Sequence, residues 1–246
     1  MEQHSVYAER PVADRLRRWS HCAWVRQVPD SASRVPATRI VPDGCVDLVW
    51  AAGRLQAVGP DSEPRRVTVS AGDCFVGVRL RPGAARLLLG DTPASEVLNR
   101  QVDLAELWGS EVAVLADGIA GQEPWRAAAR LTEALGARLH RYQPEAMVVA
   151  VAERLDQPRP PDMKTLAWDL GYSERQLRRR IVTATGYGPK TLEQILRFRR
   201  TLAAADGATV WARVAAEQGY ADQAHLTRQV RRWSHLTPGR LSSQSS

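Results

Sequence analysis

Cysteine is scarce in this sequence, and the three cysteines that occur form no motif. Cys22, Cys45 and Cys74 are odd in number and far apart, and no Cys-x-x-Cys pair is present. A zinc site or a dithiol redox motif is therefore not predicted, and we expect buried thiols that behave as small apolar side chains. The pattern assigns no catalytic residue, no metal ligand and no cofactor.

Long apolar runs are also missing. No segment approaches the ~18 apolar residues that a membrane-spanning helix needs. Residues 1–5 lack the basic segment, followed by an apolar one, that opens a secretory signal. We therefore expect a cytoplasmic protein without a membrane partner.

Acidic residues are comparatively few in the last two-fifths of the chain. Residues 145–246 hold 16 Lys and Arg against 10 Asp and Glu, whereas residues 1–144 hold 18 against 17. This asymmetry predicts a half that binds a polyanion, joined to a half with another task. A solvated basic surface would give the same counts, so the interpretation depends on the residue patterns below.

The first 92 residues contain short segments rich in valine, aromatic and β-branched residues. Turn signals such as Pro42-Asp43-Gly44 and Gly59-Pro60-Asp61 separate these segments. The expected strands are residues 21–28, 46–50, 55–58, 67–70 and 74–80. A short apolar helix over residues 84–89 would lie against this small sheet.

From residue 93 onward the pattern becomes helical. We expect helices at residues 93–100, 104–108, 123–140 and 145–156, with apolar residues at helical spacing in the longest of them. Tyr142-Gln143-Pro144 interrupts the pattern and marks the expected domain boundary. The prediction is an α+β chain with two domains. A small β-rich domain with flanking helices spans residues 1–143, and an all-α domain with two helix-turn-helix units spans residues 144–246.

The two units are visible as an internal repeat. Residues 167–172 align with residues 215–220 at an offset of 48, and Leu177, Arg179, Ile181 and Pro189 align with Leu226, Arg228, Val230 and Pro238 at an offset of 49. Each copy has a short helix, a Gly-Tyr turn and a second helix whose apolar residues are four apart. This arrangement is typical of a helix-turn-helix, in which glycine can redirect the chain after the first helix.

The start and the outward face of each second helix point to DNA. Ser173 and Gln176 match a capping box, and Asp222 can cap the other copy. With the apolar residues inward, polar side chains that suit base edges and phosphates face outward. The candidate DNA-contacting residues are Arg175, Arg178, Arg179, Gln223, His225, Thr227 and Arg228.

A third helix is expected over residues 191–205, between the two copies. It carries Leu192, Ile195 and Leu196 on one side, with arginines at 197, 199 and 200 distributed around it. Fifteen helical residues span roughly 22 Å. With its turns, this segment could place the two second helices about one turn of B-DNA apart, ~34 Å.

Residues 145–242 resemble the DNA-binding unit of the AraC/XylS family of bacterial transcription regulators. The second copy, VAAEQGYADQAHLTR from Val214 to Arg228, is close to the family signature, and Leu236-Thr237-Pro238 resembles its closing Thr-Pro. The resemblance implies that the two second helices enter adjacent major grooves of double-stranded DNA through the candidate residues above. The sequence departs from the family at His235, where glycine is usual, and around Trp233.

Residues 41–49 and 77–85 resemble the domain of unknown function that often precedes such units. The resemblance implies effector sensing or dimerisation, which leaves a small-molecule effector, RNA polymerase and a second copy of the chain open as partners. Within these segments, Asp43, Asp47, Arg79 and Arg81 are expected either to line a polar pocket or to form surface ion pairs.

Two other function classes compete with an effector-responsive regulator. One is a non-specific architectural DNA binder. The other is a regulator that accepts a methyl group from alkylated DNA on a cysteine, for which only Cys22, beside His21, has a neighbour that could act as a base. Footprinting separates the first alternative, and a methyl-transfer assay tests the second.

Overall fold

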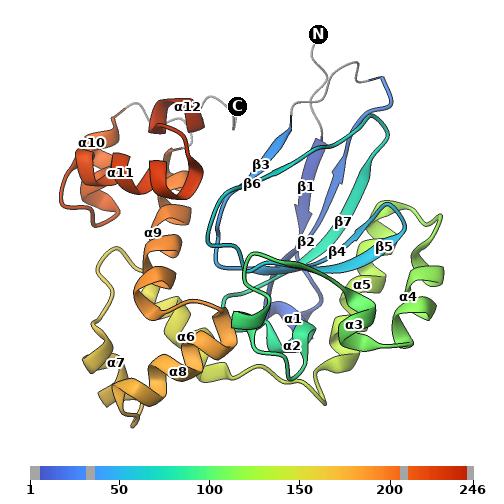
Figure 1. Cartoon of the computed structure of the whole chain (residues 1–246), viewed down its shortest axis with the longest axis horizontal. Coiled ribbons are helices and arrows are strands. Elements are labelled where there is room, and N and C mark those ends of the chain that lie inside the picture. Colours follow the sequence, from blue (N-terminus) through green and yellow to red (C-terminus); the bar gives the residue numbers. More distant parts are fainter. Residues whose placement is uncertain (1–5, 32–36, 206–209, 243–246) are drawn as a thin grey trace.

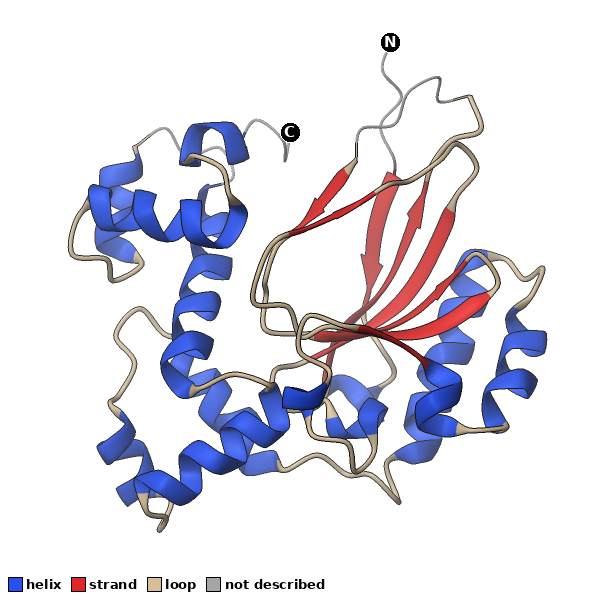
Figure 2. Cartoon of the chain, viewed as in Figure 1, coloured by secondary structure: helices blue, strands red, loops and turns tan. Residues whose placement is uncertain are grey.

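A computed structural model describes residues 6–31, 37–205 and 210–242. An antiparallel sheet forms the amino-terminal half, with helices covering one of its faces, and an all-helical region lies on the opposite side (Figures 1 and 2). This arrangement confirms the predicted α+β fold with a β-rich amino-terminal domain and a helical carboxy-terminal region.

The main sheet has six strands in the order β1-β2-β7-β4-β5-β8, and all its neighbours are antiparallel. A separate two-stranded ribbon pairs β3 with β6. The strands are β1 (Val6–Arg10), β2 (Ser20–Gln27), β3 (Thr38–Ile40), β4 (Val46–Ala51), β5 (Arg54–Val58), β6 (Arg65–Val67), β7 (Cys74–Leu80) and β8 (Gln101–Asp103).

The two faces of the main sheet have different surroundings. Leu48 and Val78 are register partners and are completely buried on the face that packs against helices. The preceding and following residues, Asp47 and Arg79, are also partners, and they point to the other face because successive residues in a strand alternate. The sheet therefore has an apolar face, which forms part of the core, and a polar face that points away from it.

Helices close the apolar face. Leu131 and Leu135 of α5 are fully buried in this first core, where α5 packs on β2 and β7. Glu123 caps the amino terminus of α5, so the helix starts at Pro124. The elements of this layer are α1 (Asp14–Arg17), α2 (Arg86–Leu89), the 3-10 helix η1 (Ala94–Glu96), α3 (Leu104–Trp108), α4 (Glu111–Ile119) and α5 (Pro124–Arg138).

Several predicted elements are wrong in extent. The strand expected at 67–70 is β6, which ends at Val67, and the helix expected at 93–100 is only the 3-10 turn η1, because Pro93 precedes it and Asn99 adopts a positive φ of 60°. The strands β1, β3 and β8 and the helices α1, α4 and α12 were not predicted.

The carboxy-terminal helices surround a second core. They are α6 (Ala146–Leu155), α7 (Met163–Asp169), α8 (Glu174–Thr185), α9 (Pro189–Ala205), α10 (Trp211–Glu217), α11 (Gln223–Ser234) and α12 (Pro238–Ser242). Helix α6 belongs to both cores, since Val149 packs in the first and Val148 in the second. Among the described residues, no helix combines the length and apolar character needed to cross a membrane.

Candidate nucleic-acid interface and the adjoining cavity

The first helix-turn-helix consists of α7 and α8. Ser173 accepts a hydrogen bond from the backbone N–H of Gln176 while the Gln176 side chain accepts one from the backbone N–H of Ser173, which is the predicted capping box. Leu177 and Ile181 are completely buried. The inward face of α8 is therefore fixed as the repeat predicted.

The outward face of α8 is strongly basic. Arg175, Arg178 and Arg179 are exposed, and the structure records no ion pair for any of them within the described residues. Arg180 differs from these three because its guanidinium is 2.6 Å from a carboxylate oxygen of Glu145. Three guanidinium groups on one helix are thus available to an external anion.

The second unit consists of α10 and α11. The Asp222 side chain caps α11 by accepting a hydrogen bond from the backbone N–H of His225 at 2.6 Å, and Leu226 and Val230 are completely buried. The helix ends at Ser234, and its C-cap residue, His235, has a φ of 57° in the left-handed region. Glycine adopts this conformation most readily at the end of a helix, and in this chain a histidine adopts it.

The candidate residues of α11 are of two kinds. Gln223 and Arg228 are exposed, whereas His225 and Thr227 are partly buried. The Nδ1 atom of His225 accepts a hydrogen bond from the backbone N–H of Ala221 at 3.4 Å, and Thr227 donates its hydroxyl to the Gln223 carbonyl at 2.9 Å. His225 and Thr227 therefore support the helix as well as lying beside its outward surface.

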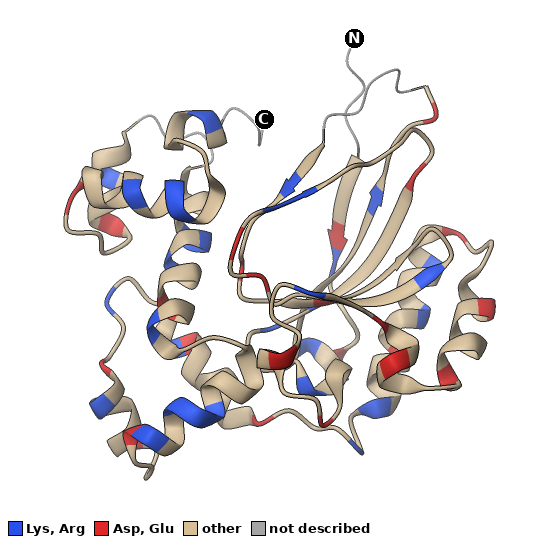
Figure 3. Ribbon diagram, viewed as in Figure 1, with Lys and Arg blue, Asp and Glu red and all other residues tan. Residues whose placement is uncertain are grey.

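Helix α9 joins the two units, which lie at its opposite ends (Figure 1). Its apolar residues Leu192 and Ile195 are completely buried. Its arginines are not a free basic surface: Arg197 pairs with Glu193, and Arg199 and Arg200 both pair with Asp156 at the end of α6. Basic bands on α8 and α11 remain as the outward charge of this region (Figure 3).

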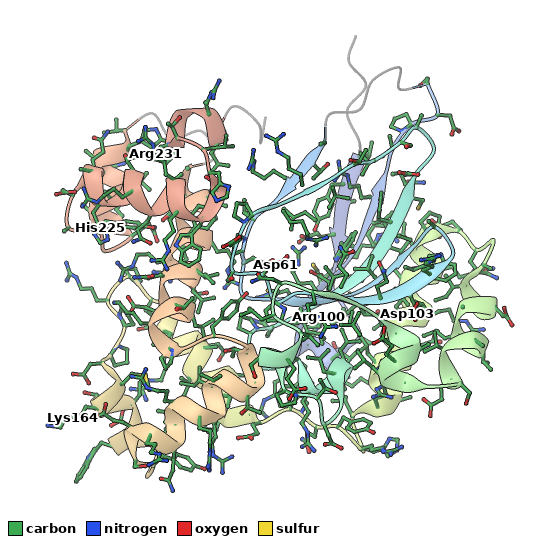
Figure 4. All side chains as sticks on the ribbon, viewed as in Figure 1. Asp61, Arg100, Asp103, Lys164, His225 and Arg231 are labelled. Atoms are coloured by element: carbon green, nitrogen blue, oxygen red, sulfur yellow. The ribbon has the colours of Figure 1, made fainter. Side chains whose placement is uncertain are left out.

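Several polar contacts connect the helical region to the sheet domain. Arg39 of β3 donates to the Ser234 carbonyl at 3.0 Å, at the end of α11. Tyr187, between α8 and α9, donates to the Asp61 carbonyl at 2.6 Å. Arg199 donates to the Asp43 carbonyl at 3.4 Å. These contacts come from the end of α11, from the turn between α8 and α9, and from α9 itself, and Figure 4 labels Asp61 on the side of the sheet domain that faces the helical region.

A cavity of about 670 Å³ lies over the polar face of the sheet. The β3–β6 ribbon forms another wall, and Arg199 of α9 contributes to the lining. Asp43, Asp47 and Arg79 line this cavity, as one of the two expectations proposed, but Arg81 does not, because its side chain donates to the Arg17 carbonyl. The sequence did not predict the contribution of Arg199.

The charged end of the cavity is built around Arg79. Its guanidinium lies 3.2 Å from Asp47, 3.5 Å from Asp43 and 3.8 Å from Glu9. Burial raises the pKa of Asp47, and the attraction of Arg79 opposes this shift. Conversely, the carboxylate of Asp47 raises the pKa of Arg79. Three carboxyl groups therefore share one guanidinium at this end.

Cys22 and Cys45 are buried thiols, as expected, whereas Cys74 is only partly buried. Burial raises the pKa of Cys22 to about 12 and that of Cys45 well above its usual value, and Cys74 shifts in the same direction. A thiol becomes a strong nucleophile only as the thiolate. These environments therefore disfavour the methyl-accepting alternative at Cys22.

Comparison with known families gives two matches. Residues 9–103 match a family described as a domain of unknown function, DUF6597, and residues 166–244 match a family described as a helix-turn-helix domain. The second match covers α8 and α11 and confirms the predicted AraC-type unit. The chain therefore has a region similar to DUF6597 followed by a helix-turn-helix region of the AraC type, and this composition supports a DNA-binding role in transcription regulation.

No curated protein matches the chain. Among solved structures, ToxT from Vibrio cholerae O395 is similar over 83% of this chain and 87% of its own, with 10% identity and a TM-score of 0.44. The transcriptional regulator CdpR from Pseudomonas aeruginosa is similar over 72% of this chain and 47% of its own, with 18% identity and a TM-score of 0.36.

Proposed function

We propose that the chain is a sequence-specific regulator that reads two successive major-groove segments of DNA with α8 and α11. The observation that carries this proposal is the duplicated unit, with Leu177 and Leu226 buried and basic residues outward at both ends of α9. Helix α9 has 17 residues, and a helix of that length spans roughly 25 Å. With the turns on either side, this length suits helices about one turn of B-DNA apart, ~34 Å.

The candidate residues have distinct roles in this proposal. Arginine can bind guanine through two hydrogen bonds and glutamine can bind adenine in the same way, so the exposed side chains suit direct readout. Some arginines will bind phosphates and fix the register instead. His225 and Thr227 contact the base edges from positions that their own hydrogen bonds hold. The full set is Arg175, Arg178, Arg179, Gln223, His225, Thr227 and Arg228.

We further propose that residues 1–143 sense an effector and residues 144–246 bind DNA. The cavity supports this division, because one of its lining residues, Arg199, belongs to the helix that joins the two reading units. A molecule in the cavity would contact both parts of the chain at once. RNA polymerase and a second copy of the chain are additional partners in this proposal.

The experiment starts from a duplex selected from a random pool by the full-length protein. We expect nuclease footprinting to show two protected segments about one helical turn apart, and affinity to fall steeply with salt because bound phosphates release counterions. Arg178→Ala and Arg228→Ala should each weaken specific binding by about 1–3 kcal/mol if the lost contact is to a base. Arg180→Ala is the matched control, since Glu145 already holds that guanidinium.

The same footprinting and affinity data test the alternative function, a non-specific architectural DNA binder. Such a protein would bind the selected duplex and a random duplex with similar affinity, and its footprint would be continuous or absent. Equal effects of Arg178→Ala and Arg180→Ala on both duplexes would likewise remove α8 as a reading helix.

A further inference from the structure

The floor of the cavity contains an aromatic surface whose position the fold specifies. Trp24 of β2 lies against the backbone of β7 at Gly77, where an added Cβ would be 2.4 Å from the indole ring. Its Nε1 donates to Asp47 at 2.9 Å, which fixes the ring orientation. Tyr7 of β1 stands beside it, with the ring centroids 6.1 Å apart and the planes inclined by 35°. Both rings line the cavity.

The charges around these rings are unevenly distributed. Tyr7 donates its hydroxyl to Glu9 at 2.5 Å, so the carboxylate of Glu9 lies at the edge of the aromatic surface. Glu9 shares Arg79 with Asp43 and Asp47. One guanidinium cannot neutralise three carboxylates, so this end of the cavity has an excess of acidic groups.

Three of the other arginines that line the cavity, Arg39, Arg65 and Arg199, have polar partners other than the carboxylates around Arg79. The guanidinium of Arg199 is paired with Asp156, outside the lining, and that of Arg39 donates to the Ser234 carbonyl. Arg65 lies 3.7 Å from Asp61 on the opposite wall. Arg26 of β2 is the register partner of Tyr7 in β1 and of Phe75 in β7. The acidic cluster around Arg79 is therefore one part of a cavity whose lining also holds Arg199, which donates to the Asp43 carbonyl, and Arg26, the strand partner of Tyr7.

We propose that this cavity binds an organic cation, with its ammonium or amidinium group among the three carboxyl groups and its apolar body over Trp24 and Tyr7. The inference rests on the proposed effector function and names the chemical class of that effector. A cation over an aromatic face gains from the ring quadrupole even at an exposed site, and here Tyr7 is 47% exposed. The volume of about 670 Å³ lies within the range of small-molecule sites, ~300–1,000 Å³.

The test uses four probes that share an indole body and differ in charge. Tryptamine is a cation, tryptophol is neutral, indole-3-propionate is an anion and tryptophan is a zwitterion. In isothermal titration calorimetry of the full-length protein, we expect tryptamine to bind at least 10-fold more tightly than each of the others. Undetectable tryptamine binding at 1 mM probe, roughly the weak end of specific affinities, or tighter binding of the anion or the zwitterion, would overturn the assignment.

Two variants locate the binding. Glu9→Gln keeps an acceptor for the Tyr7 hydroxyl and should weaken tryptamine by about 3- to 10-fold while leaving tryptophol unchanged. Trp24→Leu should weaken both probes. Glu133→Gln, which alters an exposed carboxylate on α5, is the control and should change neither. Equal tryptamine affinity in Glu9→Gln and Glu133→Gln would overturn the proposed site.

Footprinting on the same preparations separates this inference from the proposed function. Two protected segments without a preference for tryptamine would remove the ligand class and leave the DNA-reading function. A preference for tryptamine in a protein that does not discriminate between duplexes would leave the cation site and remove the sequence-specific function.

Discussion

Arg199 of α9 lies 3.2 Å from the Nε2 atom of His21 in β2, so a side chain of the helix between the two reading units contacts the sheet domain directly. The same guanidinium pairs with Asp156 and donates to the Asp43 carbonyl. A neutral imidazole can accept a hydrogen bond from arginine, whereas an imidazolium cannot. The protonation state of His21 therefore matters for the connection between the domains.

Acid should weaken the protein through this histidine. Burial, together with Arg199 and Arg81, lowers the pKa of His21 to about 4. Since the unfolded chain protonates His near pH 6.5, it binds more protons than the folded chain below that pH, and the stabilisation is lost as pH falls from about 6.5 to about 4. We expect His21→Gln, which retains a side-chain acceptor, to reduce the pH dependence of the free energy of unfolding in urea titrations. An unchanged slope between pH 6.5 and 4 would contradict the role of His21.

The end of each reading helix provides a paired test of backbone conformation. His235 and Gly186 occupy equivalent places in the repeat, with φ of 57° and 79°. His235→Gly should raise the free energy of unfolding by about 0.5–1 kcal/mol, because a side chain in this region is strained while glycine also loses more entropy on folding. Thermal unfolding measures this change, and a destabilised variant would show that the histidine side chain has a compensating contact.

Gly186→Ala should have the opposite and larger effect. An added Cβ would be 2.7 Å from Pro60 and 3.1 Å from the Ala94 carbonyl, so the substitution disturbs the contact of α8 with the sheet domain as well as the local φ. Gly171→Ala is the control for φ alone, since its φ is 70° and nothing lies within 4 Å of the added atom. We expect about 1–2 kcal/mol for Gly171→Ala and a clearly larger loss for Gly186→Ala. Equal losses would mean that the interdomain contact does not contribute.

Much of the helical region could be predicted from the sequence because its signals are local. The capping box at Ser173 and Gln176, the four-residue spacing of apolar positions and the 49-residue offset all lie within the repeat itself, and the helices formed where these signals placed them. The central strands β4 and β7 were predictable for a similar reason, since both faces of each strand meet other elements and their composition is rich in valine.

The remaining elements depend on tertiary contacts. Every residue of β1 is exposed, so its sequence VYAER has no apolar alternation to reveal a strand, and β3 and β8 have only three residues each. The cavity was only partly predictable. Asp43 and Arg79 lie in the segments 41–49 and 77–85, which the sequence singled out. Arg199 is more than 100 residues from Asp43 in the chain, and it reaches the cavity only because of how the two cores pack.

Asp156 should be a major link within the helical region. It accepts hydrogen bonds from both Arg199 and Arg200, and its side chain is 21% exposed. Asp156→Asn leaves two partly buried guanidinium groups without their anion, and we expect a loss of about 2 kcal/mol or more in the free energy of unfolding. Asp169→Asn is the matched control, because its pair with Arg154 is 38–40% exposed and should contribute less than about 1 kcal/mol. Similar losses in the two variants would show that the ion pairs of Asp156 contribute no more to the free energy of unfolding than the exposed pair of Asp169.

The β3–β6 ribbon should hold the second reading unit through Arg39. Its guanidinium donates to the Ser234 carbonyl at the end of α11, whereas its strand partner Arg66 is exposed. Arg39→Ala removes the donor to that carbonyl, and we expect faster amide hydrogen exchange in α12 and in the turn at His235, because elements with fewer buried contacts open more readily. Arg66→Ala keeps the ribbon and the Ser234 contact and should leave these amides unchanged. If Arg39→Ala leaves these amides unchanged as well, α9 alone positions the second unit. Any effect of a ligand in the cavity on α11 must then be transmitted through Arg199.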